Sequence, residues 1–178
     1  MTAVRLDRWT VTSGSNVNSR AAVVVRGADH DWKASAEGNG PVDALYRAVD
    51  RALADVLGGD HPQLLAYDVH ALAEGPSAEG RVTVVIAPPR TAAGERVVGR
   101  YTGEAAGTNT IAASVEAYLR ALNEMLGSDA WSGVTESAAE VAAARRAERR
   151  GGAAPSGDVA AEFDDDARPI DTTEWFNR

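Results

Sequence analysis

The sequence contains no cysteine among its 178 residues. Disulfide bonds, thiolate metal sites and cysteine nucleophiles are therefore excluded, and the composition fits a reducing cytosol. Long hydrophobic runs are also missing: nowhere do about 18 apolar residues stand together, the length of a membrane-spanning helix. No apolar stretch follows the positive charges near the N-terminus either. We therefore expect a soluble, cytoplasmic protein that is not exported and has no membrane partner.

Clustered positive charge is scarce. The net charge is −8, and residues 151–178 hold seven acids against two arginines. The one basic cluster, residues 145–150, is interrupted by Glu148 and is typical of a solvated helix end. Because neutralising a phosphate backbone requires clustered Lys and Arg, we expect no nucleic-acid partner.

Motifs of catalysis and cofactor binding are not found. The sequence has no Ser–His–Asp arrangement, nucleophile elbow or Gly-x-x-x-x-Gly-Lys phosphate loop. Asp68 and His70 share one face of a predicted strand, but without a third ligand a paired or solvent-facing strand is favoured over a metal site. The sequence therefore predicts no catalytic residue, no metal site and no cofactor.

One structural unit is written twice. Segments rich in Val, Thr and Trp, separated by turns with Gly and Asn, predict strands over residues 6–13, 21–25 and 31–36. Apolar residues at spacings of three and four from Val42 onward then predict a helix that ends at Gly58 and Gly59. This first unit covers residues 5–59.

The second unit, residues 62–126, repeats the order strand, strand, strand, helix. Its strands are predicted over residues 64–73, 81–87 and 96–101. A glycine-rich loop over residues 103–107 then leads into a helix over residues 111–126. Each unit alone is too small to bury a good core. We therefore expect an α+β domain over residues 1–127, in which two pseudo-symmetric β-β-β-α units pack together.

The composition changes after Gly127. Residues 128–150 are predicted to form an Ala- and Arg-rich helical extension, and residues 151–178 have the Gly, Pro and Asp content of a disordered acidic tail. Trp175 and Phe176 near the end of the tail leave two interpretations open, a short docking peptide or a terminal hydrophobe without a role.

The junction that begins at Gly38 has the composition of an anion site. Gly38 and Gly40 permit positive φ and close approach of a ligand, Pro41 suits the first position of a helix, and Asp43 lies at the positive end of the helix dipole. Free amides at such a turn suit a carboxylate or phosphate, although Asp43 competes for them. A tight turn without a ligand is the alternative. With the second glycine-rich loop, centred on Ala105, the junction would suit a small carboxylate with an aliphatic group, such as a branched-chain amino acid.

Four segments carry a resemblance to a known family. They are the run Gly-Asn-Gly-Pro-Val-Asp-Ala-Leu-Tyr-Arg-Ala at residues 38–48, and residues 67–75, 80–84 and 113–123. Together they resemble, in order, the C-terminal regulatory domain of 2-isopropylmalate synthase, which citramalate synthase shares. The resemblance covers residues 6–126. It implies paired β-β-β-α units, a homodimer, and leucine as a feedback inhibitor held between the units near the dimer interface.

The resemblance also implies a set of ligand-binding residues at the two helix starts. They are Gly38, Asn39, Gly40, Pro41, Asp43, Ala44, Gly107, Asn109, Thr110 and Ile111. Many members of the family carry an acid where this chain has Thr110.

In the family this domain follows a catalytic barrel that binds a divalent metal and condenses acetyl-CoA with 2-oxoisovalerate. The chain has no room for that barrel, so we expect no catalysis by this chain alone. Three functions remain open: a free-standing allosteric regulatory domain that binds leucine or a related branched-chain amino acid, a regulatory subunit of a separately encoded 2-isopropylmalate synthase in leucine biosynthesis, and a structural dimerisation module whose ligand site has decayed.

Overall fold

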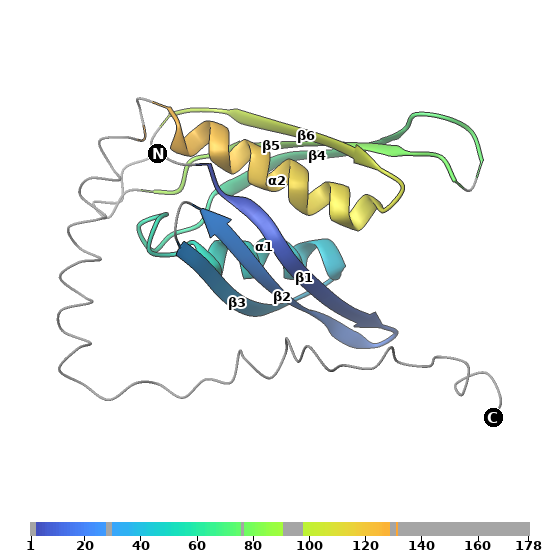
Figure 1. The fold of residues 1–178 in the computed structure, drawn as a ribbon, viewed down its shortest axis with the longest axis horizontal. Helices are drawn as coiled ribbons and strands as arrows, with labels where there is room; N and C mark the ends of the chain where they lie inside the picture. Colours follow the sequence, from blue (N-terminus) through green and yellow to red (C-terminus); the bar gives the residue numbers. More distant parts are fainter. Residues whose placement is uncertain (1–2, 28–29, 76, 91–97, 129–130, 132–178) are drawn as a thin grey trace.

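The structure is a computed structural model that describes residues 3–27, 30–75, 77–90, 98–128 and 131. Two units with the same order of elements follow one another along the chain (Figure 1). The first consists of β1 (Arg5–Gly14), β2 (Val17–Gly27), β3 (His30–Gly38) and α1 (Pro41–Ala52). The second consists of β4 (Gln63–Ala71), β5 (Gly80–Ala87), β6 (Tyr101–Gly107) and α2 (Thr110–Leu126). The predicted α+β class with two β-β-β-α units is confirmed.

Each unit is an antiparallel three-stranded sheet with one covering helix. The sheet orders are β1-β2-β3 and β4-β5-β6, so the second strand of each unit is central. The continuous apolar run Ala21–Val25 is buried throughout, as expected for a central strand. In β5, Val82, Val84 and Ile86 are buried and alternate with less buried neighbours, which places the apolar face of this strand toward α2.

The third strand of the second unit corrects a prediction. The expected strand at residues 96–101 and loop at residues 103–107 are wrong, because β6 covers Tyr101–Gly107 and residues 98–100 form no strand. Tyr101, Gly103 and Ala105 are buried in alternation with exposed neighbours. A Cβ atom on Gly103 would lie 1.9 Å from the carbonyl oxygen of Ala117. This glycine therefore permits a strand to approach a helix and does not mark a loop.

The first helix ends earlier than predicted. α1 stops at Ala52, and residues 53–59 continue as turns. Leu53 and Leu57 in these turns are still buried, which explains why the apolar spacing continues beyond the helix. Gly58 and Gly59 adopt φ of 77° and 90°, the left-handed region that reverses the chain toward β4.

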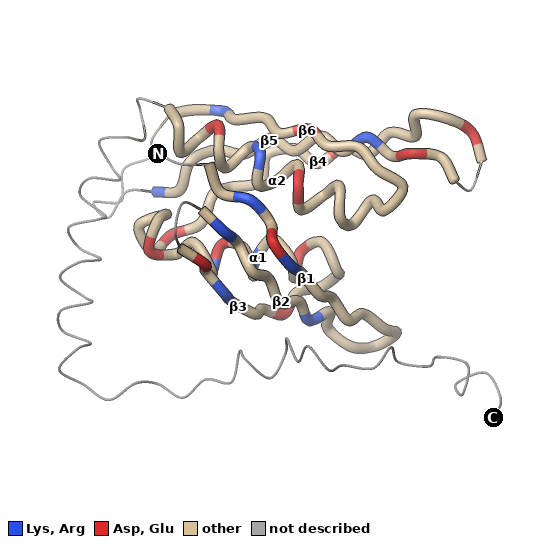
Figure 2. The backbone as a smooth tube through the Cα atoms, in the orientation of Figure 1, with Lys and Arg blue, Asp and Glu red and all other residues tan. Residues whose placement is uncertain are grey.

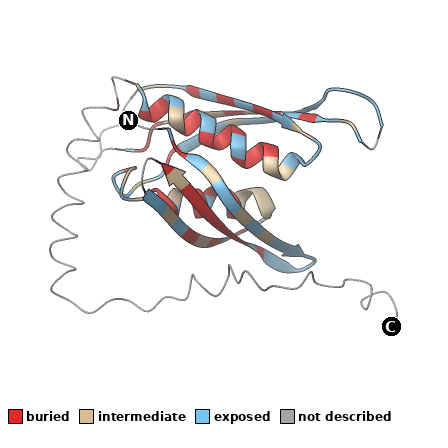
Figure 3. Ribbon diagram, in the orientation of Figure 1, coloured by how far each residue is buried: buried red, intermediate tan, exposed pale blue. Residues whose placement is uncertain are grey.

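The two units share one core, as predicted, and burial is concentrated on their facing helices and sheets (Figure 3). The ring of Tyr46 in α1 stacks on the ring of Tyr118 in α2, with centroids 4.3 Å apart and an interplanar angle of 18°. The side chain of Asn123 in α2 holds the backbone of Val4, accepting its N–H at 2.8 Å and donating to its carbonyl oxygen at 2.7 Å. The start of the first unit is thereby attached to the helix of the second.

Of the predicted helical extension and acidic tail, the structure describes only Ser128 and Trp131, and the side chain of Trp131 is 1% exposed and belongs to the core. The boundary at residue 127 stays a prediction, and core contacts continue past it. No helix among the described residues is both long and apolar enough to cross a membrane.

Candidate functional site

The start of α1 is held together by its own side chains. Gly40, the residue before the helix, is extended, with φ of −155° and ψ of 172°, and no side chain caps the helix from that position. Instead the Asp43 carboxylate accepts the N–H of Asn39 at 2.9 Å and pairs with Nε of Arg47 at 3.0 Å. Pro41 has no N–H, so the amides of Val42 and Asp43 are the first-turn donors that lack an intrahelical partner.

Neither glycine of this junction adopts the positive φ that it permits, and only Gly38 serves packing. The glycines of positive φ among the described residues are Gly58, Gly59 and Gly75. Gly38 is buried, and a Cβ atom there would lie 2.5 Å from the backbone nitrogen of Ala44. An added Cβ at Gly40 would meet no atom within 4 Å. Gly38 therefore fits the strand end under the helix, and Gly40 leaves space on the outer side of the turn.

The start of α2 is capped differently. The side-chain oxygen of Asn109 accepts the N–H groups of Ile111 and Ala112, both at 3.1 Å. Thr110 lies against β5, because a Cβ atom on Gly80 would come within 2.9 Å of its methyl group. Two of the free amides of this helix start are thus already occupied by Asn109.

A hydrogen-bonded cluster joins the two helix starts. The hydroxyl of Tyr46 in α1 donates to the carbonyl oxygen of Ser114 in α2 at 3.2 Å, and the hydroxyls of Ser114 and of Tyr67 in β4 lie 2.8 Å apart. Burial raises the pKa of Tyr46, so its hydroxyl keeps its proton. Of the ten residues that the resemblance implied, six lie before and in the first turn of α1, and four lie at the end of β6 and the start of α2.

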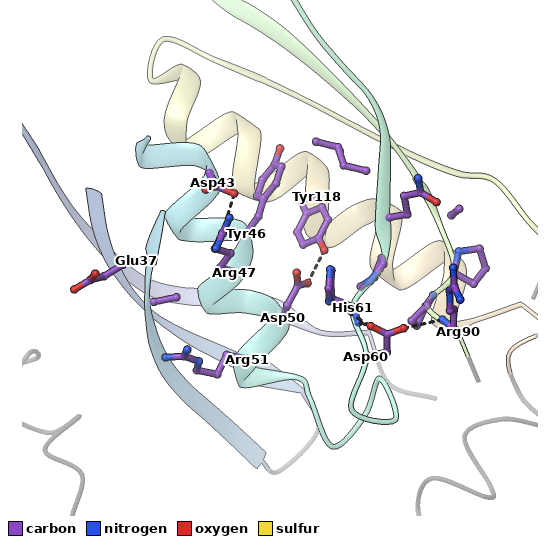
Figure 4. Close-up of a pocket in the computed structure, with 17 residues that line it drawn as sticks. Glu37, Asp43, Tyr46, Arg47, Asp50, Arg51, Asp60, His61, Arg90 and Tyr118 are labelled. Carbon is purple, nitrogen blue, oxygen red and sulfur yellow. Dashed lines mark hydrogen bonds and ion pairs between the residues drawn. The ribbon is translucent and has the colours of Figure 1, made fainter. Parts of the chain in front are cut away.

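A groove of about 800 Å³ lies beside α1, and sequence reasoning missed it. It is lined by residues of α1, the end of β3, the segment that enters β4, the segment that follows β5, and Tyr118 of α2 (Figure 4). Asp43 is the one member of the implied ligand set that lines it. The segments that form the groove are far apart in the sequence, and the local signal was a row of charged residues, Asp43, Arg47, Asp50 and Arg51, on one helix.

Asp50 and Tyr118 form the floor of the groove. The Tyr118 hydroxyl donates to Oδ1 of Asp50 at 2.5 Å, across the junction between the units. Burial raises the pKa of Asp50 to about 6, against the opposing effects of the Tyr118 hydrogen bond and the charge of His61. Burial and the neighbouring Asp50 raise the pKa of Tyr118 well above its usual value. At neutral pH the pair is therefore a carboxylate and a neutral phenol.

The walls of the groove carry both signs of charge (Figure 4). Arg47 is paired with Asp43, and Nη1 of Arg51 donates to the carbonyl oxygen of Ser35 at 2.7 Å. On the opposite wall, Nδ1 of His61 lies 3.3 Å from Oδ1 of Asp60. Charges of both signs are likewise interspersed over the two units as a whole (Figure 2).

Strand β4 has an exposed apolar surface, which we call the β4 edge surface. Its members are 39–46% exposed: Leu64, Leu65, Tyr67 and Val69 in β4, and Leu72 directly after it. β4 is an edge strand of its sheet. Asp68 and His70 are also exposed on β4, and no group of three or more His, Asp or Glu side chains that could hold a metal gathers among the described residues.

Comparison with known proteins identifies relatives for most of the chain. Residues 2–126 match the family model described as the LeuA allosteric (dimerisation) domain. The 2-isopropylmalate synthase of Dechloromonas aromatica (strain RCB) is 35% identical over 115 residues, which cover 65% of this chain and 20% of that protein. That of Salinibacter ruber (strain M8) is 36% identical over 126 residues, 70% of this chain and 20% of that protein. The chain thus spans about a fifth of the length of these curated relatives.

Proposed function

Because this chain belongs to the LeuA allosteric (dimerisation) domain family, we propose that it binds leucine or a related branched-chain amino acid as an effector and forms a homodimer. The observation that carries the proposal is the pair of helix starts joined by Tyr46, Ser114 and Tyr67. An amino acid offers a carboxylate for helix-start amides, an ammonium group for Asp43 or a carbonyl oxygen, and an aliphatic side chain. The contact residues we propose are the ten implied by the resemblance.

The β4 edge surface is the proposed dimer interface. Exposed apolar side chains on an edge strand favour association. Because the matching family is described as a dimerisation domain, the expected partner is a second copy of this chain. Tyr67 belongs to this surface and hydrogen-bonds Ser114 beside the start of α2. Effector binding and dimerisation would therefore be coupled through one side chain.

We assign no catalytic step to this chain, since the match is confined to the regulatory part of the relatives. The relatives are synthases, which makes the second candidate a regulatory subunit that transmits the effector signal to a 2-isopropylmalate synthase in leucine biosynthesis. Co-purification of such a synthase with the chain, in amounts that depend on leucine, would favour this candidate.

Calorimetric titration of the full chain with leucine, isoleucine and valine tests the effector proposal, with D-leucine as the control ligand. We expect saturable binding of at least one L-amino acid and much weaker binding of D-leucine. The substitution Gly40→Val should abolish this binding and leave the melting temperature unchanged, because an added Cβ at Gly40 meets no atom within 4 Å. Gly14→Val, where the Cβ would meet Val17 at an ordinary 3.4 Å, is the matched control. If no branched-chain amino acid binds, the structural dimerisation module remains.

A further inference from the structure

We propose that the groove beside α1 is a second small-molecule site, distinct from the helix starts, and that it takes an organic ammonium group at the Asp50 carboxylate. Asp43 and Asp50 are seven residues apart, about 10 Å along a helix that rises 1.5 Å per residue. A single amino acid cannot place its carboxylate at the start of α1 and its ammonium group at Asp50. Asp43 and Tyr46 line the groove and also belong to the proposed effector site, but the ammonium position at Asp50 is separate from the helix start. This proposal therefore does not depend on the proposed effector function.

The hydrogen bonding of Asp50 leaves room for a donor. A carboxylate accepts about four hydrogen bonds, and among the described residues Asp50 accepts one, from Tyr118 to Oδ1. Oδ2 is left to the groove. Tyr118 acts as a positioning residue, because its hydroxyl fixes the carboxylate from the opposite unit.

Among the described residues, no Lys or Arg forms an ion pair with Asp50, and His61 is the one cation whose charge affects its pKa. Arg47 is paired with Asp43, Arg51 extends toward the backbone of Ser35, and His61 contacts Asp60 (Figure 4). A partly buried carboxylate without a paired cation is costly, which agrees with its raised pKa. A ligand ammonium group would bring both the missing positive charge and three hydrogen-bond donors.

The rest of the groove suits the remainder of such a ligand. Its volume of about 800 Å³ is within the usual range of small-molecule sites. Pro62, Pro88 and Pro89 provide apolar contact for a short aliphatic chain. The lining holds four acids against three arginines, Glu37, Asp43, Asp50 and Asp60 against Arg47, Arg51 and Arg90. The balance of these charges therefore favours a cationic ligand.

Two analogues that each keep one charged group of leucine distinguish this site from the proposed effector site. Isopentylamine keeps the aliphatic chain and the ammonium group, and 4-methylpentanoate keeps the chain and the carboxylate. We expect isopentylamine to bind the full chain and to lose about tenfold or more in affinity with Asp50→Asn, the typical effect of removing a charge-assisted hydrogen bond. Binding should be unchanged in Gly40→Val and in Asp55→Asn, which removes an exposed acid outside the groove.

The Asp50→Asn variant retains an oxygen that accepts the Tyr118 hydrogen bond, so we expect it to stay folded. Its melting curve checks this. Failure of isopentylamine to bind at millimolar concentration, or equal binding by wild type and Asp50→Asn, would overturn the groove proposal. Failure of leucine and 4-methylpentanoate to bind, with isopentylamine still bound, would instead overturn the effector proposal alone.

Discussion

The two units have the same order of elements but differ in how their first strands are covered. In β1, Leu6, Trp9 and Val11 pack partly against the core, and β1 contacts both helices. In β4, every residue except Ala66 is exposed (Figure 3). The first unit is therefore closed by the helix of the second, whereas the second unit keeps an open apolar edge. A repeated topology has produced two different surfaces, and the open one is where we expect the second copy.

The starts of the two helices also differ, in how they are capped. Asn109 caps α2 directly, whereas α1 has no side-chain cap and is held by Asp43. Ten residues into the helices, counted from the capping positions Gly40 and Asn109, the first unit has Asp50 and the second has the buried Leu119. At this position the first unit thus has a charged group where the second unit has a buried apolar side chain.

The largest effect is expected at Gly103, where the second unit depends on close strand and helix contact. Gly103→Ala would place a Cβ atom 1.9 Å from the Ala117 carbonyl oxygen and force α2 away from β6. We expect a loss of about 3 kcal/mol or more in the free energy of unfolding, at the upper end of overpacking effects. Urea unfolding measures it, with Gly107→Ala as the control in the same strand, since a Cβ there meets no atom within 4 Å. Equal stability of both variants would contradict this account of β6.

The second-largest expected effect is the dependence of stability on pH that Asp50 causes. The folded-state pKa of about 6 lies above the ordinary aspartate value of 3.8, so the folded state holds this proton more tightly than the unfolded state. Stability should therefore fall as pH rises from about 4 to 6, by up to about 3 kcal/mol at roughly 1.4 kcal/mol per pKa unit. Asp50→Asn should lose this part of the pH dependence and be more stable than wild type at pH 7.5. Urea unfolding at pH 4.5 and 7.5 checks this, and parallel pH profiles would refute it.

The smallest effect is expected on assembly. Val69 is 44% exposed on the β4 edge surface, and Val69→Lys should weaken dimerisation by about tenfold or more, about 1.4 kcal/mol, with little change in monomer stability. His70→Lys, on the opposite face of the same strand, is the matched control. Sedimentation equilibrium measures both. Equal dissociation constants for the two variants would place the interface elsewhere.

The sequence predicted the parts of the fold that follow from local patterns. The apolar spacing in α1 and α2 and the β-branched run of β2 need no knowledge of tertiary structure. Gly103 was misinterpreted because a glycine that marks a turn and a glycine that admits a helix look the same in one sequence. The capping role of Asn109 is local, yet the resemblance assigned it to a ligand. The groove brings together α1, the end of β3, the segments before β4 and after β5, and Tyr118, a set of neighbours that only the packing of the two units creates.

Hydrogen exchange of the full chain with and without saturating leucine tests the central claim most directly, namely that two unlike units hold one effector between them. The account predicts slower exchange of the amides at both helix starts, residues 39–45 and 109–115, with little change in β2. Protection at one helix start alone, or at neither, would contradict the claim.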